Sequence, residues 1–231
     1  MKMLVSDFDR TFYINDIDIE INKEYVDKFR KMNNIFLFAT GRCYASFMNV
    51  KRKFNLEYDY LILDHGSLIM DNNDNILYKY TLDNNLLYRL LPYLSLDKCD
   101  CYYFCSLREK IKEINNNEIT KIYLRYNNKM DRNNVFKIIN DKFKDCFSIY
   151  YLSNYAIEIV SKMVNKSYAI DKLINIIKVN KSDVYTIGDG YTDIEMIKNY
   201  NGYMISNGIK ELESVALRKV DSVSLLLRDI M

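Results

Sequence analysis

The sequence predicts an α/β protein: a Rossmann-like core with a parallel sheet, interrupted by a small inserted α+β module. Apolar runs typical of buried strands alternate with amphipathic helical stripes at both ends of the chain. From about residue 82 the pattern changes to short strands with alternating side chains. We therefore expect a core domain of residues 1–81 and 161–231 and an α+β domain of residues 82–160.

The first strand is a short apolar run from Met3 to Val5 that leads directly to Asp7 and Asp9. Because burying an unpaired charge is costly, we expect both carboxylates in the crevice outside the C-terminal edge of the sheet. Two clustered carboxylates suit an oxygen-ligated cation such as Mg²⁺, and one of them is also suited to act as a nucleophile. The alternative is an Asx turn in which both only cap the chain locally.

The second strand is the continuous apolar run of residues 35–39. A stripe of apolar residues at helical spacing precedes it between residues 21 and 32, so strand, helix and strand form a βαβ unit. A run that is apolar throughout fits a strand covered on both faces, as in a parallel sheet.

Thr40, Gly41 and Arg42 follow this strand directly. A hydroxyl and free backbone N–H groups at the start of a helix form a suitable phosphate seat. The alternative is a simple N-cap for a helix over residues 43–54. Arg42 either reaches a substrate or packs within the loop.

A third strand, residues 59–63, ends before His65, the only histidine of the chain. His65 either contacts a substrate or is a solvated or hydrogen-bonded bystander. Two further short strands, residues 68–70 and 76–80, are separated by an Asn-rich turn and predict a β-hairpin.

The inserted module is expected to be αββαββ, with a helix that stops near Pro92 and an antiparallel sheet. On the strand of residues 119–126, Lys121, Tyr123 and Arg125 alternate with apolar residues. They form either a solvated sheet face or a face that helps to select the substrate. The charged residues 108–112 are interpreted as a solvated loop.

Core sequence resumes with Lys166 at the start of an amphipathic helix. A cation there opposes the helix dipole, so Lys166 is expected to serve an anion instead; Lys162 is the competing candidate. The strand of residues 184–187 delivers Asp189 to the sheet edge, and Asp193 follows in the first turn of the next helix, where it also suits the dipole. A strand at 202–206, a helix at 209–217 and the closing segment 222–230 complete the expected core.

Composition narrows the function classes. With 33 basic and 31 acidic side chains and a net charge of +2, the chain has no basic excess that would indicate a nucleic-acid partner. No apolar stretch approaches the roughly 20 residues that span a bilayer, and we expect no membrane association. The start of the chain leaves no room for a signal peptide, and five cysteines are an odd number, so free thiols and a cytoplasmic location are expected. Oligomeric state is not readable.

Four motifs in series resemble those of the haloacid dehalogenase-like (HAD) phosphohydrolases. Residues 7–11, Asp-Phe-Asp-Arg-Thr, resemble the DxDxT signature. The segments 39–42, Ala-Thr-Gly-Arg, and 186–193, Thr-Ile-Gly-Asp-Gly-Tyr-Thr-Asp, follow in the family's order, with Lys166 between them. The spacing resembles the Cof-type branch, whose type IIB cap lies between the second and third motifs.

The resemblance implies a Mg²⁺-dependent phosphatase of a small phosphorylated metabolite, most plausibly a sugar phosphate. It implies an aspartyl-phosphate on Asp7, with Asp9 as the general acid/base. Thr40 and Lys166 would bind the phosphoryl oxygens. The implied metal ligands are Asp7, Asp9 through its backbone carbonyl, Asp189 and Asp193; the implied phosphate- or substrate-binding residues are Thr11, Gly41, Arg42 and His65.

Three residues depart from the family pattern: Arg10 stands where glycine is usual, His65 precedes the glycine of the third-strand loop, and Thr192 replaces an asparagine. Two other functions stay open from the sequence. One is a phosphomutase that returns the phosphoryl group to a sugar. The other is a regulatory or binding protein that keeps the acidic pocket without turnover.

Overall fold

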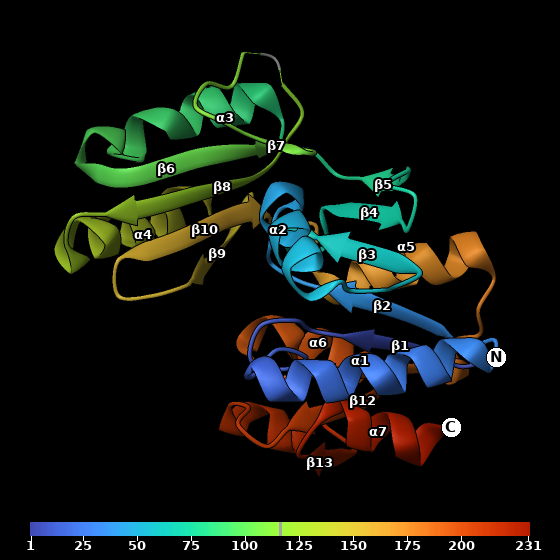
Figure 1. The fold of residues 1–231 in the computed structure, drawn as a ribbon. Helices are drawn as coiled ribbons and strands as arrows, with labels where there is room; N and C mark the ends of the chain where they lie inside the picture. Colours follow the sequence, from blue (N-terminus) through green and yellow to red (C-terminus); the bar gives the residue numbers. More distant parts are fainter. Residues whose placement is uncertain (116) are drawn as a thin grey trace. The chain divides into compact units, whose positions relative to one another are not determined.

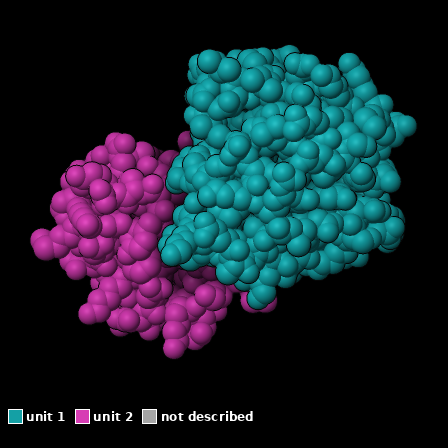
Figure 2. Space-filling view, turned by 90° about the horizontal axis from the view of Figure 1, so that it is seen from below, with its two compact units in different colours: residues 1–42, 46–78, 165–231 teal, residues 43–45, 79–164 magenta. Residues whose placement is uncertain are grey.

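The computed structural model describes residues 1–115 and 117–231 as two compact units, coloured separately in Figure 2. The first unit comprises Met1–Arg42, Ser46–Tyr78 and Asn165–Met231, and the second comprises Cys43–Ala45 and Lys79–Val164. We keep the division at residues 81/82 and 160/161 as our proposal for the domain boundaries. Across the described residues, no helix is both long enough and apolar enough to cross a membrane.

The first unit is built on a sheet that has eight strands within the described part of the chain. Their spatial order is β13-β12-β11-β1-β2-β3-β4-β5, and every pairing from β13 to β3 is parallel, whereas β4 runs antiparallel to β3. This confirms the predicted parallel core (Figure 1). The strands are β1 (Met3–Ser6), β2 (Ile35–Ala39), β3 (Tyr60–Leu63), β4 (Leu68–Asp71), β5 (Ile76–Lys79), β11 (Val184–Gly188), β12 (Asn201–Ile205) and β13 (Arg218–Val220).

Helices cover both faces of this sheet (Figure 1). β2 illustrates the consequence: Phe36 and Phe38 pack into an aromatic cluster with Phe47, whereas Leu37 and Ala39 join the apolar cluster under the helices of the other face. A strand covered on both sides has no solvent face, which explains its continuous apolar run. The helices are α1 (Asp16–Lys31), α2 (Tyr44–Phe54) and α7 (Val223–Ile230) on one face, and α5 (Lys166–Ile177) and α6 (Ile194–Asn199) on the other.

Asparagine side chains fix the starts of the two longest helices of this unit. The Asn15 side chain accepts hydrogen bonds from the N–H groups of Ile17 and Asp18 at the start of α1. Asn165 caps α5 in the same way by accepting from the N–H of Tyr168 at 2.8 Å. Capping satisfies backbone donors that have no partner within the helix, so each helix begins at a defined residue. Lys166 is therefore held at the first position of α5.

The second unit contains a five-stranded antiparallel sheet in the described residues, with strand order β7-β6-β8-β10-β9. Its helices pack on one face; Ile122 and Leu124 of the sheet join Val135 and Ile139 in one buried cluster. The elements are α3 (Asn84–Leu90), β6 (Cys99–Ser106), β7 (Glu109–Ile111), β8 (Ile119–Tyr126), α4 (Lys129–Phe143), β9 (Phe147–Tyr151) and β10 (Ala156–Ser161).

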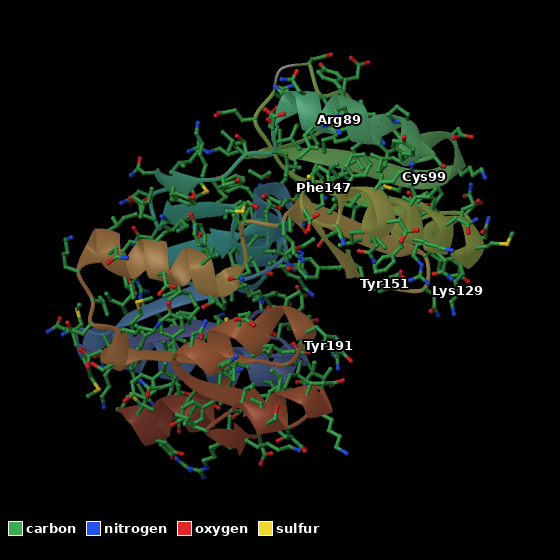
Figure 3. All side chains as sticks on the ribbon, turned by 180° about the vertical axis from the view of Figure 1, so that it is seen from behind. Arg89, Cys99, Lys129, Phe147, Tyr151 and Tyr191 are labelled. Carbon is green, nitrogen blue, oxygen red and sulfur yellow. The ribbon has the colours of Figure 1, made fainter. Side chains whose placement is uncertain are left out.

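Edge strand β9 carries two aromatic side chains to helix α4, and both are labelled in Figure 3. Phe147 is buried against Phe143, with ring centroids 6.0 Å apart. Tyr151 stacks on Phe136 at 4.2 Å, although half of its surface is exposed. Aromatic pairs of this kind add to the apolar burial that joins the helix to the sheet.

Two sequence interpretations of elements were wrong. The charged residues after position 108 are not all loop, because Glu109–Ile111 forms β7 and pairs with β6, so the module is αβββαββ. Leu107, with φ 50°, turns the chain back, and a solvent-facing edge strand tolerates charged side chains. Residues 209–217 are also not an α-helix. They contain the short 3₁₀-helix Lys210–Ser214, since backbone bonds to Asp189 and Gly202 tie both ends of this stretch to the core.

The sheet face carrying Lys121 is not uniformly solvated. Lys121 is only 1% exposed and pairs with Glu158 of β10. Tyr123 stacks on Tyr103, with ring centroids 4.6 Å apart, whereas Arg125 is exposed and pairs with Asp100. The alternation along β8 was predicted correctly, but its first member lies in a buried ion pair.

Candidate active site

The register of three parallel strands brings the motif residues to one edge of the sheet. Ser6, the last residue of β1, pairs with Ile187 of β11 and with Phe38 of β2. Asp7 follows Ser6 directly, and Asp189 and Thr40 each lie two residues beyond the partner on their own strands. The three side chains therefore leave the sheet at its carboxyl edge, beside the central strand, where open α/β sheets bind ligands.

Lys166 joins two of the aspartates. Its ammonium Nζ lies 2.6 Å from Oδ1 of Asp7 and 2.6 Å from Oδ1 of Asp193. All three side chains are buried. Burial alone would lower the pKa of Lys166, but the charges of Asp193 and Asp7 raise that pKa above its usual value, so the lysine stays protonated. Lys166, rather than the exposed Lys162, is thus the lysine that contacts Asp7.

Asp193 also holds the loop between β11 and α6. Its Oδ2 accepts the N–H groups of Asp189 at 3.0 Å and Gly190 at 2.9 Å. A Cβ on Gly188 would lie 2.5 Å from Cγ of Asp193, so the close approach of this carboxylate requires glycine there. The hydrogen bonds that hold this loop are therefore made by Asp193.

Three carboxylates converge next to the lysine. Asp7, Asp189 and Asp193 each offer an oxygen, and these oxygens lie within 4.8 Å of one another. Burial raises the pKa of Asp7 to about 8; Lys166 opposes this rise and Asp193 adds to it. Burial and Asp193 also raise the pKa of Asp189. When all three carboxylates are ionised they outnumber the ammonium of Lys166 by two charges, and this all-oxygen donor set fits a hard divalent cation.

Asp9 lies outside this cluster and is paired with Arg42. Arg42 Nε donates to Oδ2 of Asp9 at 2.7 Å, and Nη2 donates to Oδ1 at 2.6 Å. Two parallel bonds of this kind fix the plane of the carboxylate. The sequence offered substrate contact or loop packing for Arg42, and it did not predict this pair.

The loop after β2 is folded on itself and covered by His65. Thr40 Oγ1 accepts the N–H of Arg42 at 3.2 Å, and the carbonyl of Thr40 accepts the N–H of His65 at 3.2 Å. A Cβ on Gly41 would lie 2.4 Å from Cε1 of His65, so the imidazole packs directly on the glycine. His65 is 4% exposed; it is therefore a buried residue of the segment after β3 that packs on this loop, not a solvated bystander.

Two further contacts support Asp189. Thr11 donates its hydroxyl to Oδ1 of Asp189 at 3.1 Å. Arg10 places Nε 3.4 Å from Oδ2 of the same carboxylate. Both contacts join segments about 180 residues apart, so the local pattern of the sequence carried no signal for them.

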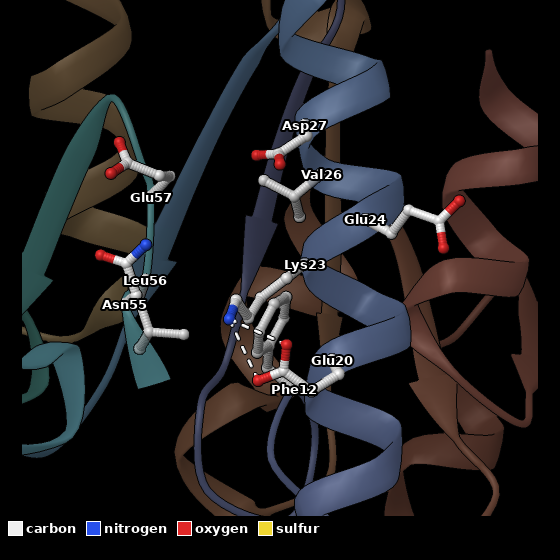
Figure 4. A pocket seen from close by; sticks show the side chains of 9 residues that line it. All are labelled: Phe12, Glu20, Lys23, Glu24, Val26, Asp27, Asn55, Leu56 and Glu57. Atoms are coloured by element: carbon white, nitrogen blue, oxygen red, sulfur yellow. Dashed lines mark hydrogen bonds and ion pairs between the residues drawn. The ribbon is translucent and has the colours of Figure 1, made fainter. Parts of the chain in front are cut away.

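A separate hollow lies beside α1 (Figure 4). Its volume is about 340 Å³, and its lining includes Glu20, Glu24, Asp27 and Glu57 together with Lys23. Lys23 is paired with Glu20 at 3.0 Å. None of the aspartates of the metal-type cluster lines this hollow.

Fold and cluster together define an α/β protein with an inserted module and an acidic site at the carboxyl edge of its parallel sheet. A family model described as haloacid dehalogenase-like hydrolase matches residues 4–111 and 101–224. The chain therefore belongs to the haloacid dehalogenase-like hydrolases.

Individual relatives and solved structures are similar to the chain over most of its length. The chain is 26% identical to an uncharacterized protein of Mycoplasma capricolum, covering 88% of this chain and 90% of that one. It is 24% identical to a protein named "Putative phosphatase" of Buchnera aphidicola, covering 99% and 97%. Among solved structures, a "putative HAD/COF-like hydrolase" from Plasmodium vivax superposes with a TM-score of 0.85 at 18% identity, covering 100% and 95% of the two chains.

Proposed function

We propose that the protein is a Mg²⁺-dependent phosphatase that hydrolyses a small phosphorylated metabolite through an aspartyl-phosphate on Asp7. The observation that carries this proposal is the buried contact of 2.6 Å between Asp7 and Lys166, next to two more carboxylates at the carboxyl edge of the sheet. Sugar phosphates are the substrate class to test first. We propose no nucleic-acid partner.

The first step would be attack of an Asp7 oxygen on phosphorus. A bond from Asp7 to phosphorus forms while the ester bond to the leaving alcohol breaks, and Asp9 gives a proton to that alcohol. The contact with Arg42 sets the direction of the Asp9 carboxylate, but it occupies both oxygens, so one of the two bonds would open when Asp9 carries the proton. Thr40 and Lys166 would donate to the phosphoryl oxygens as their charge redistributes.

The second step would hydrolyse the aspartyl-phosphate. Asp9, now ionised, takes a proton from a water molecule, which attacks phosphorus as the bond to Asp7 breaks. Inorganic phosphate leaves and Asp7 is regenerated. The ammonium of Lys166, bonded to both Asp7 and Asp193, would compensate the carboxylate that reappears.

Asp7, Asp189, Asp193 and the backbone carbonyl of Asp9 would hold Mg²⁺. When bound, the cation would neutralise charge on the carboxylates and the phosphoryl oxygens. The convergence of three carboxylate oxygens within 4.8 Å of one another supports a divalent ion there.

The test is release of inorganic phosphate from p-nitrophenyl phosphate and a panel of sugar phosphates, with Mg²⁺ or with EDTA, for wild type and Asp7→Asn. We expect metal-dependent turnover that disappears in the variant. Stable labelling of Asp7 by a phosphodonor without turnover would move the protein to the phosphomutase or regulatory class. The absence of both turnover and labelling would refute the proposal that the protein is an enzyme.

A further inference from the structure

Arg10 adopts a backbone conformation that an arginine rarely takes. Its φ angle is 65°, in the left-handed region where glycine is free of strain and a residue with a Cβ is not. Such strain persists only where surrounding contacts determine the conformation, and it concentrates at functional sites.

The contacts that hold Arg10 come from Tyr13, whose carbonyl accepts the Arg10 N–H at 2.9 Å, and from Asn207. The amide Nδ2 of Asn207 donates to the carbonyl of Arg10 at 3.1 Å. In return, Nη2 of Arg10 donates to the carbonyl of Asn207 at 3.3 Å. Both the backbone and the side chain of Arg10 are thus hydrogen-bonded to Asn207.

From this position the guanidinium reaches a proposed metal ligand. Nε lies 3.4 Å from Oδ2 of Asp189, while Oδ1 accepts from Thr11. The Asp189 side chain is 7% exposed and held in its loop, whereas the Arg10 side chain is 66% exposed. The exposed guanidinium of Arg10 can therefore swing away from the pair, whereas the buried carboxylate of Asp189 stays in place.

We propose that Arg10 is a built-in competitor for the divalent cation, whose guanidinium occupies Asp189 until the metal displaces it. This inference rests on the metal site of the proposed function. A cation beside a ligand oxygen repels the incoming metal and also has to be released, so Arg10 weakens metal binding. For a largely exposed charge at this distance, we expect the loss of affinity to be about three- to tenfold.

The experiment measures the Kd for Mg²⁺ from the rise of the Tm with Mg²⁺ concentration, starting from EDTA-stripped protein; it needs no turnover. Arg10→Gln removes the charge and keeps both a similar length and the left-handed strain. Arg10→Lys keeps the charge, and Arg10→Gly removes charge and strain together. Arg228→Gln, at an exposed arginine far along the chain, controls for the change in net charge.

We expect Arg10→Gln and Arg10→Gly to bind Mg²⁺ about three- to tenfold more tightly than wild type, with Arg10→Lys and Arg228→Gln close to wild type. Adding Asp189→Asn should abolish the difference. Mg²⁺ binding by Arg10→Gln equal to or weaker than that of wild type would overturn the inference alone and leave the phosphatase intact. If wild type binds no Mg²⁺ up to 50 mM, as a roughly saturating test of weak sites, both the inference and the proposed metal site are overturned.

Discussion

Arg42 and Asp9 lie in loops that follow different strands, yet they form the most regular ion pair of the site, with two nitrogens on two carboxylate oxygens. Asp9 is about half exposed, so water screens much of the attraction between the charges. The pair therefore contributes more to the orientation of the carboxylate than to stability. Orientation is what an acid/base group needs, since a misplaced proton donor loses rate.

Replacing Arg42 with alanine should lower kcat roughly 10- to 100-fold, with a smaller effect on KM. The free energy of unfolding should change by less than about 1 kcal/mol. Steady-state kinetics on p-nitrophenyl phosphate and urea unfolding measure the two quantities. Ser46→Ala, which removes only a hydroxyl 3.4 Å from Nη1 of Arg42, is the matched control. An unchanged kcat in Arg42→Ala would show that Asp9 needs no such support.

At the scale of the element, helix α5 presents the site lysine, and its first turn depends on the cap at Asn165. Asn165→Ala should cost about 0.5–2 kcal/mol of stability and should also lower kcat, because Lys166 is the next residue. Asn15→Ala removes an equivalent cap from α1 and should cost a similar stability without changing kcat. Urea unfolding and initial rates test both variants. Equal values of kcat in Asn165→Ala and Asn15→Ala would show that the cap at Asn165 does not position Lys166 for catalysis.

Strand β8 contributes a second prediction at this scale, through the buried pair of Lys121 and Glu158. Lys121→Met leaves the glutamate buried without its cation and should cost about 3–5 kcal/mol. Combining Lys121→Met with Glu158→Leu should recover most of that loss, since an apolar pair of similar volume is often as stable. Urea unfolding of the single and double variants tests this. A double variant as unstable as the single one would contradict the argument.

Some strands of this protein were predictable from the local sequence and others were not. β1 and β11 were predictable, because an apolar run followed by an acidic residue is a local signal of a buried strand that ends at a sheet edge. β7 was missed, since a charged edge strand has no pattern of its own. The pairs of Arg42 with Asp9 and of Arg10 with Asp189 depend on strand register and on a left-handed φ, which no local pattern encodes.

For the whole molecule, the buried carboxylates connect stability to pH. Burial raises the pKa of Asp7 from 3.8 to about 8 in the folded protein. Between these two values the folded state holds a proton that the unfolded state has released. The metal-free protein should therefore lose stability as the pH rises through this window. Below pH 3.8, the pKa of Asp7 in the unfolded chain, Asp7 is protonated in both states, so burying it carries no ionisation penalty and stability no longer changes with pH through this residue.

Asp7→Asn should consequently be more stable than wild type in EDTA at pH 8, by about 1–3 kcal/mol, and nearly equal to it at pH 4. Urea unfolding at the two pH values measures the difference. Asp145→Asn, at an exposed aspartate, should show no such pH-dependent gain. A variant that is less stable than wild type at pH 8 would mean that the contact with Lys166 outweighs the cost of burial.

The pairing of β1 with β11 has a consequence for how the chain is made. Met3 aligns with Val184, so β1 cannot pair with β11 until about 180 further residues have been synthesised. At a synthesis rate of about 5–20 residues per second, a ribosome needs roughly 10–35 s to supply it. During that time one edge of β1 is unpaired, and for most of it Asp7 lacks Lys166, its partner in the folded protein. The carboxylate cluster is thus among the last parts of the fold to be completed, and until then the nascent chain carries an unpaired strand edge of the kind that favours aggregation.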